Sequence, residues 1–586
     1  MSTPEVARAP NSPRWIFSES NTQEAAALAR EAELPLLIAE LLTARRIRSA
    51  AEAAQFLSPT FDQLLDPYSM LGMDRAVARI QKAAEAREPV LIYGDYDVDG
   101  TTAVVLLKTA IEMLGGVVRF HVPHRLREGY GMQREILEIA SREGVRLVIS
   151  VDTGIRAFAA AEAAEALGLD LIVTDHHLPE TALGLPKALA ILNPNQPDCN
   201  YACKHLCGAG VAFKLSQALL EALDRDRARN KILLSFLKML AIATIADAVP
   251  LLGENRAIVA LGLEQLHKPV QPGLRSLMQV AQLDPSRRKL TPTDIGFRIA
   301  PRINAAGRMD IASEVVELFT TRDPNRARSI AEKLEQLNQD RRNTEAAMLT
   351  EIMARLDEET YREARCVVMD GDGWHRGVIG ILASRIVDQT GKPALVLAHE
   401  DGEAYGSGRS IEGFHLLEAI ESCHELFTRF GGHAHAVGFS LPSDRVAELR
   451  TRLNSYAAAN LAEENLGNPL LCHAVLPLDR VTPALFSWIR QLEPLGMGNE
   501  EPVFVARNVL LAAPPRYMKE RHVKLQLAQG MRGANLAALG WNWAARVQQM
   551  QLEEGSLLDL AYKLRENDHP EFGGLELEIA GLRLPD

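Results

Sequence analysis

Acidic and imidazole side chains recur in the first half of the chain, directly after short apolar runs that are typical of buried strands. Three groups follow three such runs: Asp95, Asp97 and Asp99 after 91–93, Asp152 after 147–151, and Asp175, His176 and His177 after 171–174. A single Asp after a strand is usually a turn or helix-cap residue. Three groups together are different, because the carboxyl ends of parallel strands meet at one edge of a sheet. The pattern therefore predicts one site.

Metal binding is the chemistry that such a cluster favours. Carboxylates gathered in one cleft repel one another, and divalent cations are their natural partners. Oxygen and imidazole ligands suit manganese or magnesium, and no cysteine stands at these positions to favour structural zinc. We therefore expect a two-metal hydrolytic centre.

The elements that must position this site alternate between strand and helix. From about residue 89, β-branched runs alternate with amphipathic stretches, which predicts βαβ units and a parallel sheet. A second α/β pattern follows a polar stretch that reads as one long helix, and short alternating segments near the end indicate a small antiparallel barrel. We expect five parts: an N-terminal helical segment at 1–60, a catalytic α/β domain at 61–322, a connecting helix at 323–357, a smaller α/β domain at 358–462 and a barrel at 467–586.

Composition excludes several classes of protein. The 586 residues are 47% hydrophobic and 24% charged, with 64 Lys and Arg against 76 Asp and Glu, and the formal net charge is -12. No apolar run reaches the roughly 18 residues that a membrane span requires, and the opening residues lack the apolar core of a signal peptide. We expect a cytoplasmic protein with a local basic channel rather than a generally basic surface.

Other motifs are absent or weak. The sequence has neither the glycine-rich P-loop of an ATPase nor a G-x-S-x-G nucleophile elbow. Cys199, Cys203, Cys207 and His205 could be read as metal ligands, but their spacing fits neither zinc knuckles nor a usual iron–sulfur run. We interpret these three cysteines as structural.

Several ordered motifs carry a resemblance to a known family. TDHH at 174–177 resembles the signature of the DHH phosphoesterase superfamily, and DYDVDGTTA at 95–103, SVDTG at 150–154 and IADAVPL at 245–251 are similar to its other metal-binding motifs. GSGRS at 406–410 and FGGHAHAVGFS at 430–440 resemble its DHH-associated domain. The resemblance covers about residues 60–586 and points to the branch of single-strand-specific 5′ to 3′ exonucleases.

The resemblance assigns roles in the metal centre. It implies metal binding by Asp95, Asp97, Asp99, Asp152, His176 and Asp247, with Asp95 as an extra ligand. Asp152 would bridge two ions of Mn²⁺ or Mg²⁺, and His177 would face the scissile phosphate, which makes Asp152 and His177 the catalytic pair. Some superfamily members have a metal-binding His where this chain has Tyr93, so the first metal would depend on Asp95 or on more water.

Arginines and glycines supply candidate phosphate contacts. Between 286 and 308 six basic residues face one acid, and Arg302 and Arg308 flank Asn304 in PRINAAGR. The planar guanidinium suits phosphate oxygens. Arg125 resembles another phosphate contact of the family. Ser407 and Arg409 of GSGRS would hold a terminal phosphate, with His433 either contacting it or supporting the loop.

The C-terminal barrel adds a basic segment with one aromatic residue, RYMKERHVK at 516–524. Basic residues interleaved with an aromatic ring fit a single-strand groove of the OB type, which is also what the resemblance implies for this region. The expected contacts are Arg516, Tyr517, Lys519, Arg521 and Lys524.

The sequence thus predicts a metal-dependent exonuclease of DNA repair and recombination that degrades single-stranded DNA from its 5′ end to 5′-mononucleotides. We expect a monomer without membrane contact, supplied with strands by a helicase and a single-strand-binding protein. Two alternatives are a DHH phosphodiesterase of short oligonucleotides or cyclic dinucleotides, and a non-catalytic DNA-binding scaffold. The residues after 467 argue against the first, and the intact ligand motifs argue against the second.

Overall fold

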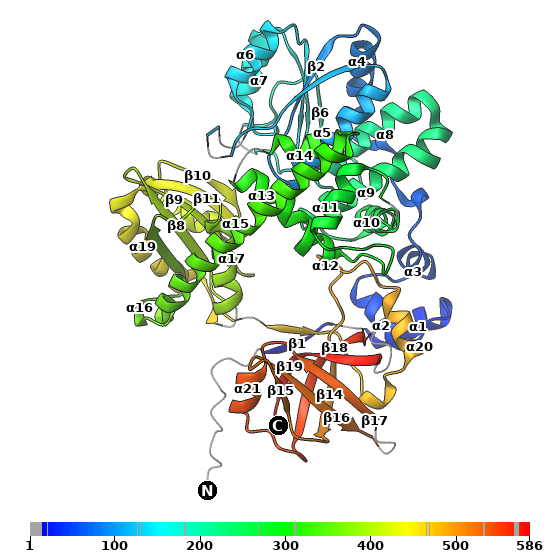
Figure 1. The fold of residues 1–586 in the computed structure, drawn as a ribbon, viewed down its shortest axis with the longest axis vertical. Coiled ribbons are helices and arrows are strands. Elements are labelled where there is room, and N and C mark those ends of the chain that lie inside the picture. Colours follow the sequence, from blue (N-terminus) through cyan, green and yellow to red (C-terminus); the bar gives the residue numbers. More distant parts are fainter. Residues whose placement is uncertain are drawn as a thin grey trace.

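The computed structural model describes residues 14–19, 21–125, 127–128, 131–180, 183–267, 269–309, 312–463, 466–467, 469–530, 534–567 and 573–585. The start of the predicted N-terminal segment, 1–13, lies outside these residues. The chain folds into α/β domains joined by a long helix and a C-terminal barrel (Figure 1). The predicted fold class is confirmed.

A five-stranded parallel sheet in the order β3-β2-β4-β5-β6 forms the centre of the first domain. Its strands are β2 (Pro89–Tyr93), β3 (Val117–His121), β4 (Leu147–Val151), β5 (Asp170–Thr174) and β6 (Ala190–Leu192). The chain passes from β2 to β3 on one side and then returns to place β4 on the other side of β2. This reversal makes the carboxyl ends of β2 and β4 a topological switch point, where open α/β sheets form their sites.

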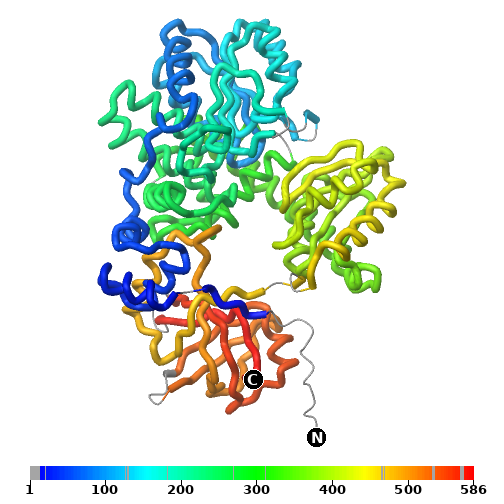
Figure 2. The backbone as a smooth tube through the Cα atoms, turned by 180° about the vertical axis from the view of Figure 1, so that it is seen from behind, coloured from blue at the N-terminus to red at the C-terminus, as the bar shows by residue number. Residues whose placement is uncertain are grey.

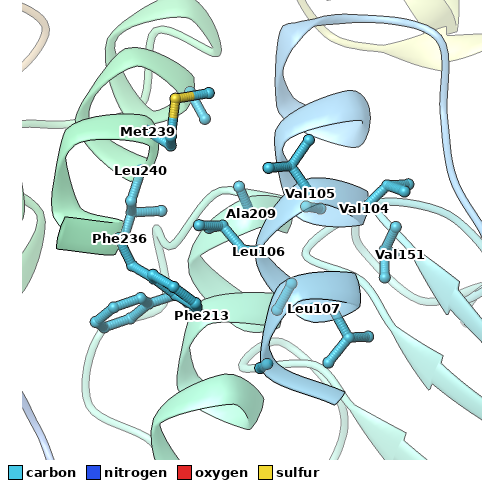
Figure 3. Close-up of a cluster of buried hydrophobic side chains, with 14 of the residues drawn as sticks. Val104, Val105, Leu106, Leu107, Val151, Ala209, Phe213, Phe236, Met239 and Leu240 are labelled. Carbon is cyan, nitrogen blue, oxygen red and sulfur yellow. The ribbon is translucent and has the colours of Figure 1, made fainter. Parts of the chain in front are cut away.

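Helices cover both faces of this sheet: α4 (Met73–Glu85), α5 (Val98–Met113), α6 (Arg134–Arg142), α7 (Phe158–Ala166) and α8 (Gly208–Arg227). Side chains of α5, α8 and α9 (Leu233–Ala246) meet Val151 of β4 in a cluster that contains Val104, Leu107 and Phe213 (Figure 3). This packing fixes the start of α5 and the end of α9, the two places where candidate carboxylates lie.

A helical layer continues from this domain. It contains a π-helical turn η3 (Ala228–Ile232), α9, α10 (Gly253–Gln265), α11 (Pro272–Val280), α12 (Pro292–Asp294), a second π-helical turn η4 (Ile295–Ile299), α13 (Ala300–Met309) and α14 (Ser313–Thr320). Helix α15 (Pro324–Leu356) is 33 residues long and leads to the next domain. Asp323 begins α15 by accepting a hydrogen bond from the Asn325 amide, with Pro324 at the first helical position.

The smaller α/β domain contains a five-stranded sheet in the order β10-β11-β9-β8-β7. Its elements are α16 (Glu359–Glu363), β7 (Val367–Asp372), α17 (Ile379–Thr390), β8 (Ala394–Glu400), β9 (Glu403–Arg409), α18 (Leu416–Glu421), β10 (Arg429–His433), β11 (Ala436–Pro442) and α19 (Val446–Asn460). Only β7 and β8 are parallel; the other described pairings are antiparallel. The sheet therefore differs from the parallel sheet of the first domain in having mostly antiparallel strands.

The C-terminal strands close on themselves. The elements are β12 (Leu470–Cys472), β13 (Ala474–Val475), α20 (Pro483–Arg490), β14 (Phe504–Leu511), β15 (Arg516–Met518), β16 (His522–Gln529), β17 (Ala534–Gly540), α21 (Ala544–Gln549), β18 (Leu557–Asn567) and β19 (Gly574–Arg583). Pairings run from β14 to β18, β19, β17, β16 and back to β14. This circuit leaves β15 as a short flap along β16.

The N-terminal helices belong with the barrel, although more than 400 residues separate them in the sequence. Strand β1 (Trp15–Phe17) pairs with β12, and α1 (Thr22–Glu31), α2 (Leu36–Ala44) and α3 (Ala50–Leu57) share one apolar core with the barrel strands. Both views place β1 and the helices α1 to α3 beside the barrel (Figures 1 and 2).

Arg256 of α10 ties this unit to the first domain. Its buried guanidinium donates to the carbonyl oxygens of Phe56, Gln491, Leu492, Glu493 and Pro494, and it lies 3.7 Å above the Phe56 ring. A buried cation is tolerated here because five carbonyl groups accept its hydrogens.

Candidate active site

Seven acidic and imidazole residues meet at the switch point of the first sheet. Three overlapping groups place their ligand atoms within 4.8 Å of one another: Asp95, Asp97 and Asp152; Asp99, His176 and Asp247; and Asp152, His176 and His177. Asp152 and His176 belong to two groups each. The structure therefore brings together every residue that the sequence predicts for the metal centre.

Local backbone geometry aims these carboxylates inward. Asp97 is the N-cap of α5, where its carboxylate accepts the Gly100 amide at 2.9 Å. Asp152 follows β4 in a left-handed conformation, with φ of 58°. Both oxygens of Asp99 accept amides from the start of α8, Gly208 at 2.5 Å and Ala209 at 2.9 Å. A side chain at Gly208 would lie 2.4 Å from the Asp152 carboxylate, so that position requires glycine.

The electrostatics of this group favour a bound cation. Burial and the neighbouring carboxylates raise the pKa of Asp95, Asp152 and Asp247 well above the ordinary aspartate value. Each of these three residues also has one buried carboxylate oxygen without a hydrogen-bond partner. Buried acceptors of this kind are costly unless a donor or a cation satisfies them. The donor set, oxygen with one imidazole, fits Mn²⁺ or Mg²⁺.

The two histidines have different surroundings. The His176 Nε2 lies 3.3 Å from Asp152, and burial lowers the pKa of His176, which keeps the ring neutral and able to coordinate. Burial opposes protonation of His177 too, but its Nδ1 lies 2.7 Å from the Asp175 carboxylate, and that contact raises the pKa of His177 overall. His177 is therefore the more cationic ring and lies at the rim of the centre.

A group of cations lies opposite this rim. Arg409 of β9 donates to the Ser407 hydroxyl at 3.2 Å, and Gly380 near the start of α17 leaves room beside both side chains. Burial and the nearby Arg125, Arg341 and Arg409 lower the pKa of Arg308 to about 10. Burial, His435, Arg409 and His177 lower the pKa of His433. We call Arg125, Arg308, Ser407, Arg409 and His433 the basic pocket; it draws on both α/β domains and fits an anion.

An open cavity of about 850 Å³ adjoins the acidic centre. It is lined by Ala246 and Ala248, which flank Asp247, and by residues of η4, α13, α15 and α17. Its polar lining includes Asn304, Arg308 and Arg342, together with Arg341 and Arg385, which both pair with Glu345. The cavity has room for several groups of a polyanion.

The chain matches three family descriptions in order. Residues 89–244 match the DHH family N-terminal domain, 363–459 the DHHA1 domain and 472–580 the RecJ OB domain. The single-stranded-DNA-specific exonuclease RecJ of Dickeya dadantii is 36% identical over 555 residues, which cover 91% of this chain and 94% of the relative. The chain belongs to the RecJ family.

Other members of the RecJ family agree with this assignment. The Bacillus subtilis single-stranded-DNA-specific exonuclease RecJ is 36% identical over 532 residues, 90% of this chain and 66% of the longer relative. The crystal structure of Thermus thermophilus RecJ in complex with Mn²⁺ superposes with a TM-score of 0.83 at 29% identity, covering 98% of this chain and 80% of that one. The same protein in complex with Mg²⁺ gives 0.76 at 27% identity, with 98% and 79% covered.

Some predicted phosphate contacts are occupied elsewhere. Arg302 is buried and forms an ion pair with Glu335, while it donates to the Arg298 carbonyl oxygen. Two neighbouring arginines also have partners within the chain. Arg288 pairs with Asp294 at 2.6 Å, and Arg298 donates to the carbonyl oxygens of Ala281 and Gln282. Arg302 is therefore placed in an internal ion pair of this RecJ-family chain and leaves the proposed phosphate site.

Three further residues turn out to position the loops of the site. Asn304 accepts the Val98 amide at 3.2 Å, so it holds the segment after β2. The hydroxyl of Tyr93 donates to Gly131 at 3.1 Å and accepts from the Gln133 amide, which directs it to the segment 131–133. Arg125 lies 5.0 Å above the Tyr96 ring.

The sequence analysis did not identify the residues that orient His176 and His177. Asp175 accepts the amides of Ile155, His176 and His177 as well as the His177 ring. Asn193 and Asn195 donate to the carbonyl oxygens of His177 and His176. Asp175 stands inside the TDHH motif and could have been proposed from it, whereas the two asparagines follow another strand and gave no signal.

All six cysteines are free, and Cys207 is buried against Thr244. No cysteine joins any of the metal-type groups among the described residues. Within the same residues, every helix is too short or too polar to cross a bilayer.

Proposed function

We propose that this chain is a metal-dependent exonuclease that degrades single-stranded DNA in the 5′ to 3′ direction and releases 5′-mononucleotides. The observation that carries the proposal is the meeting of an acidic centre and a basic pocket across two domains of a RecJ-family chain. The centre would hold cations and the pocket a terminal phosphate.

The metal ligands are proposed as Asp95, Asp97, Asp99, Asp152, His176 and Asp247, with Asp152 shared between two ions. The unpartnered oxygens of Asp95, Asp152 and Asp247 support this set. Asp95 replaces, in our proposal, the imidazole that Tyr93 does not supply. Bound Mn²⁺ or Mg²⁺ lowers the pKa of water and neutralises charge on phosphoryl oxygens.

The chain's own groups would bind and orient the strand. His177, held by Asp175, would donate from Nε2 to a non-bridging oxygen of the scissile phosphate. Arg308, Arg409 and Ser407 would bind the terminal 5′ phosphate through charge-assisted hydrogen bonds. Each cut would leave a new 5′ phosphate for the same pocket, so the direction of degradation follows from the order of the two sites.

Two expectations accompany this proposal. The cavity beside Asp247 would accommodate a single strand, which would give strand specificity by exclusion rather than by base reading. A cytoplasmic monomer fed by a helicase and a single-strand-binding protein stays a prediction.

Digestion of labelled strands tests the function. Single strands carrying a label at the 5′ or the 3′ end are incubated with Mn²⁺, with and without a chelator. We expect the 5′ label to be released first as a mononucleotide, and the chelator to stop the reaction. Release from the 3′ end first would refute the polarity. Turnover of short oligonucleotides or cyclic dinucleotides alone would favour the phosphodiesterase alternative, and binding without cleavage the scaffold.

A further inference from the structure

A second cavity lies in the first domain, between the later half of α5 and the start of α9. Its volume is about 370 Å³, and its apolar lining consists of Val105, Leu106, Met113, Ile232, Phe236 and Met239. Figure 3 shows Val105 and Leu106 pointing from α5 toward α9. This volume and an apolar lining with a few polar groups are typical of a site for a small molecule.

This cavity is separate from the acidic centre, although the same two helices border both. Asp97 and Asp99 lie at the start of α5, and Asp247 directly follows α9. At 1.5 Å per residue, Val105 lies roughly 12 Å along α5 from Asp97. The described lining shares no residue with the acidic centre, the basic pocket or the cavity beside Asp247. An occupant would therefore bind apart from the strand.

Two cations at the cavity have no partner of opposite charge. Arg227 and Lys231 both line it, and they are about one helical turn apart, which places them on the same side of the segment. Neither forms an ion pair with a carboxylate of the described residues. Arg229, between them, instead pairs with Asp62 at 3.2 Å and Glu221 at 3.7 Å. The described lining contains no carboxylate, so the cavity fits an anion.

The backbone around these cations departs from a regular α-helix. Asp224 has φ of -159° and ψ of 98°, which interrupts the last turns of α8, and its carboxylate accepts the Arg227 amide at 3.0 Å. The π-helical turn η3 follows and contains Lys231. Turns of this kind are rare and often occur at functional sites. The side chains of 224–232 that this backbone directs to the cavity are Arg227, Lys231 and Ile232.

An unsatisfied acceptor also belongs to the lining. Gln271 is the N-cap residue of α11, and its Oε1 is buried without a hydrogen-bond partner among the described residues. A buried acceptor of this kind is costly unless a donor reaches it. The occupant should therefore carry an N–H or O–H donor, in addition to a negative charge and an apolar body.

We propose that this cavity binds a nucleoside 5′-monophosphate, which is the product of the proposed function, and the inference rests on that function for this choice. The faces of the base would pack against Phe236 and Met239, and an N–H at its edge would donate to the Oε1 of Gln271. The phosphate would bind Arg227 and Lys231. A fatty acid lacks the donor along its apolar body, and a free nucleoside lacks the charge.

Calorimetry of the full chain with deoxyadenosine 5′-monophosphate tests the site. The parent carries Arg409→Ala and is kept in a chelator, so that neither the basic pocket nor a metal competes for the phosphate. We expect Arg227→Ala and Lys231→Ala each to raise Kd about 10-fold or more, the effect of a lost charge-assisted hydrogen bond. Arg225→Ala is the matched control, because Arg225 is exposed on the same segment and does not line the cavity. It should change Kd less than twofold.

Partial ligands test the chemical class of the occupant. Deoxyadenosine and inorganic phosphate should each bind the parent at least about 10-fold more weakly than the complete nucleotide. Gln271→Leu should weaken binding of the nucleotide about 2- to 10-fold and leave that of inorganic phosphate unchanged. Equal affinity for inorganic phosphate would reduce the cavity to an anion site, and equal affinity for decanoate would refute the nucleotide. Unchanged affinity in the double variant of Arg227 and Lys231 would overturn the site itself.

The methionines of the cavity locate the bound nucleotide. Met113 and Met239 both line it, whereas Met518 lies in the barrel on β15. In the parent with isotope-labelled methionine methyl groups, we expect the nucleotide to shift the resonances of Met113 and Met239 and to leave that of Met518 in place. Shifts that spare both cavity methionines would place the nucleotide elsewhere. Failure of the proposed function looks different: the chain with Arg409 intact and Mn²⁺ present would not digest a strand, yet the cavity would still bind the nucleotide.

Discussion

The acidic centre and the basic pocket face each other, but they are assembled in different ways. All seven residues of the acidic centre come from the first domain, in three overlapping groups whose ligand atoms lie within 4.8 Å of one another. The basic pocket combines Arg125 and Arg308 of that domain with Ser407, Arg409 and His433 of the second, joined through a hydrogen bond from Arg308 to the Gly377 carbonyl oxygen at 2.9 Å. The acidic centre can form within one domain, whereas the pocket exists only when the two domains are docked. Chemistry and strand placement should therefore be separable by mutation.

Removal of a shared carboxylate should have the largest effect. Asp152→Ala takes one residue from two of the three groups, and metal ligation contributes several kcal/mol to the transition state. We expect cleavage to fall at least about 1,000-fold at saturating Mn²⁺, with the fold intact by circular dichroism. His176→Ala should behave alike. Normal turnover by Asp152→Ala would disprove its bridging role.

Loss of the pocket arginine should have an intermediate effect that depends on the substrate end. A 5′ phosphate should speed the first cut, and Arg409→Ala should remove roughly 10- to 150-fold of that advantage, equivalent to charge-assisted hydrogen bonds of about 1.5 to 3 kcal/mol. Initial rates on 5′-phosphorylated and 5′-hydroxyl strands measure it. If Arg409→Ala keeps the full preference for the phosphate, the strand is placed wrongly.

Replacement of Asp175 tests how far the acidic centre and the basic pocket act separately. It contacts neither the proposed metals nor the proposed phosphate, but it fixes the His177 ring and both histidine amides. Replacement of such an orienting partner usually costs 10- to 100-fold. We expect Asp175→Asn to lower kcat by that factor with little change in KM. A change confined to KM would instead make Asp175 a residue of strand binding.

The smallest predicted effect concerns stability without metal. Burial and Asp97 raise the pKa of Asp95, which means that its charge opposes folding when no cation is bound. Asp95→Asn should therefore raise the Tm of the chelated protein by a few degrees, about 1 kcal/mol. Calorimetry with a chelator and with Mn²⁺ checks this, because the advantage should disappear or reverse when metal is present.

The acidic centre was the part of the molecule that the sequence predicted best. The carboxylates of Asp95 and Asp152, at the ends of two strands, predicted its position, because parallel strands bring their carboxyl ends to one edge of the sheet. The amides that donate to Asp99 come from Gly208 and Ala209, more than 100 residues away, and no local sequence pattern predicts such a contact. These hydrogen bonds depend on the tertiary packing of α8 against α5.

Charge patterns were less informative than motif order. Arg302 looked like a phosphate contact, but burial against α15 gives it to Glu335, a residue in a segment that reads only as a polar helix. Tyr517 and Arg516 looked like one surface, yet strand alternation separates them. A basic residue or ring shows its face only once the register is known.

The shared core of the N-terminal helices and the barrel has a consequence for synthesis of the chain. Helices α1 to α3 leave the ribosome before the barrel, and their partners in the core, beginning near Leu476, follow only after more than 400 further residues. At about 5 to 20 residues per second, this is a wait of roughly 20 to 80 s with apolar faces uncovered. The two α/β domains can fold during that interval, so the barrel closes the molecule last. A nascent chain arrested before the barrel is complete should be a substrate for chaperones at its N-terminal end.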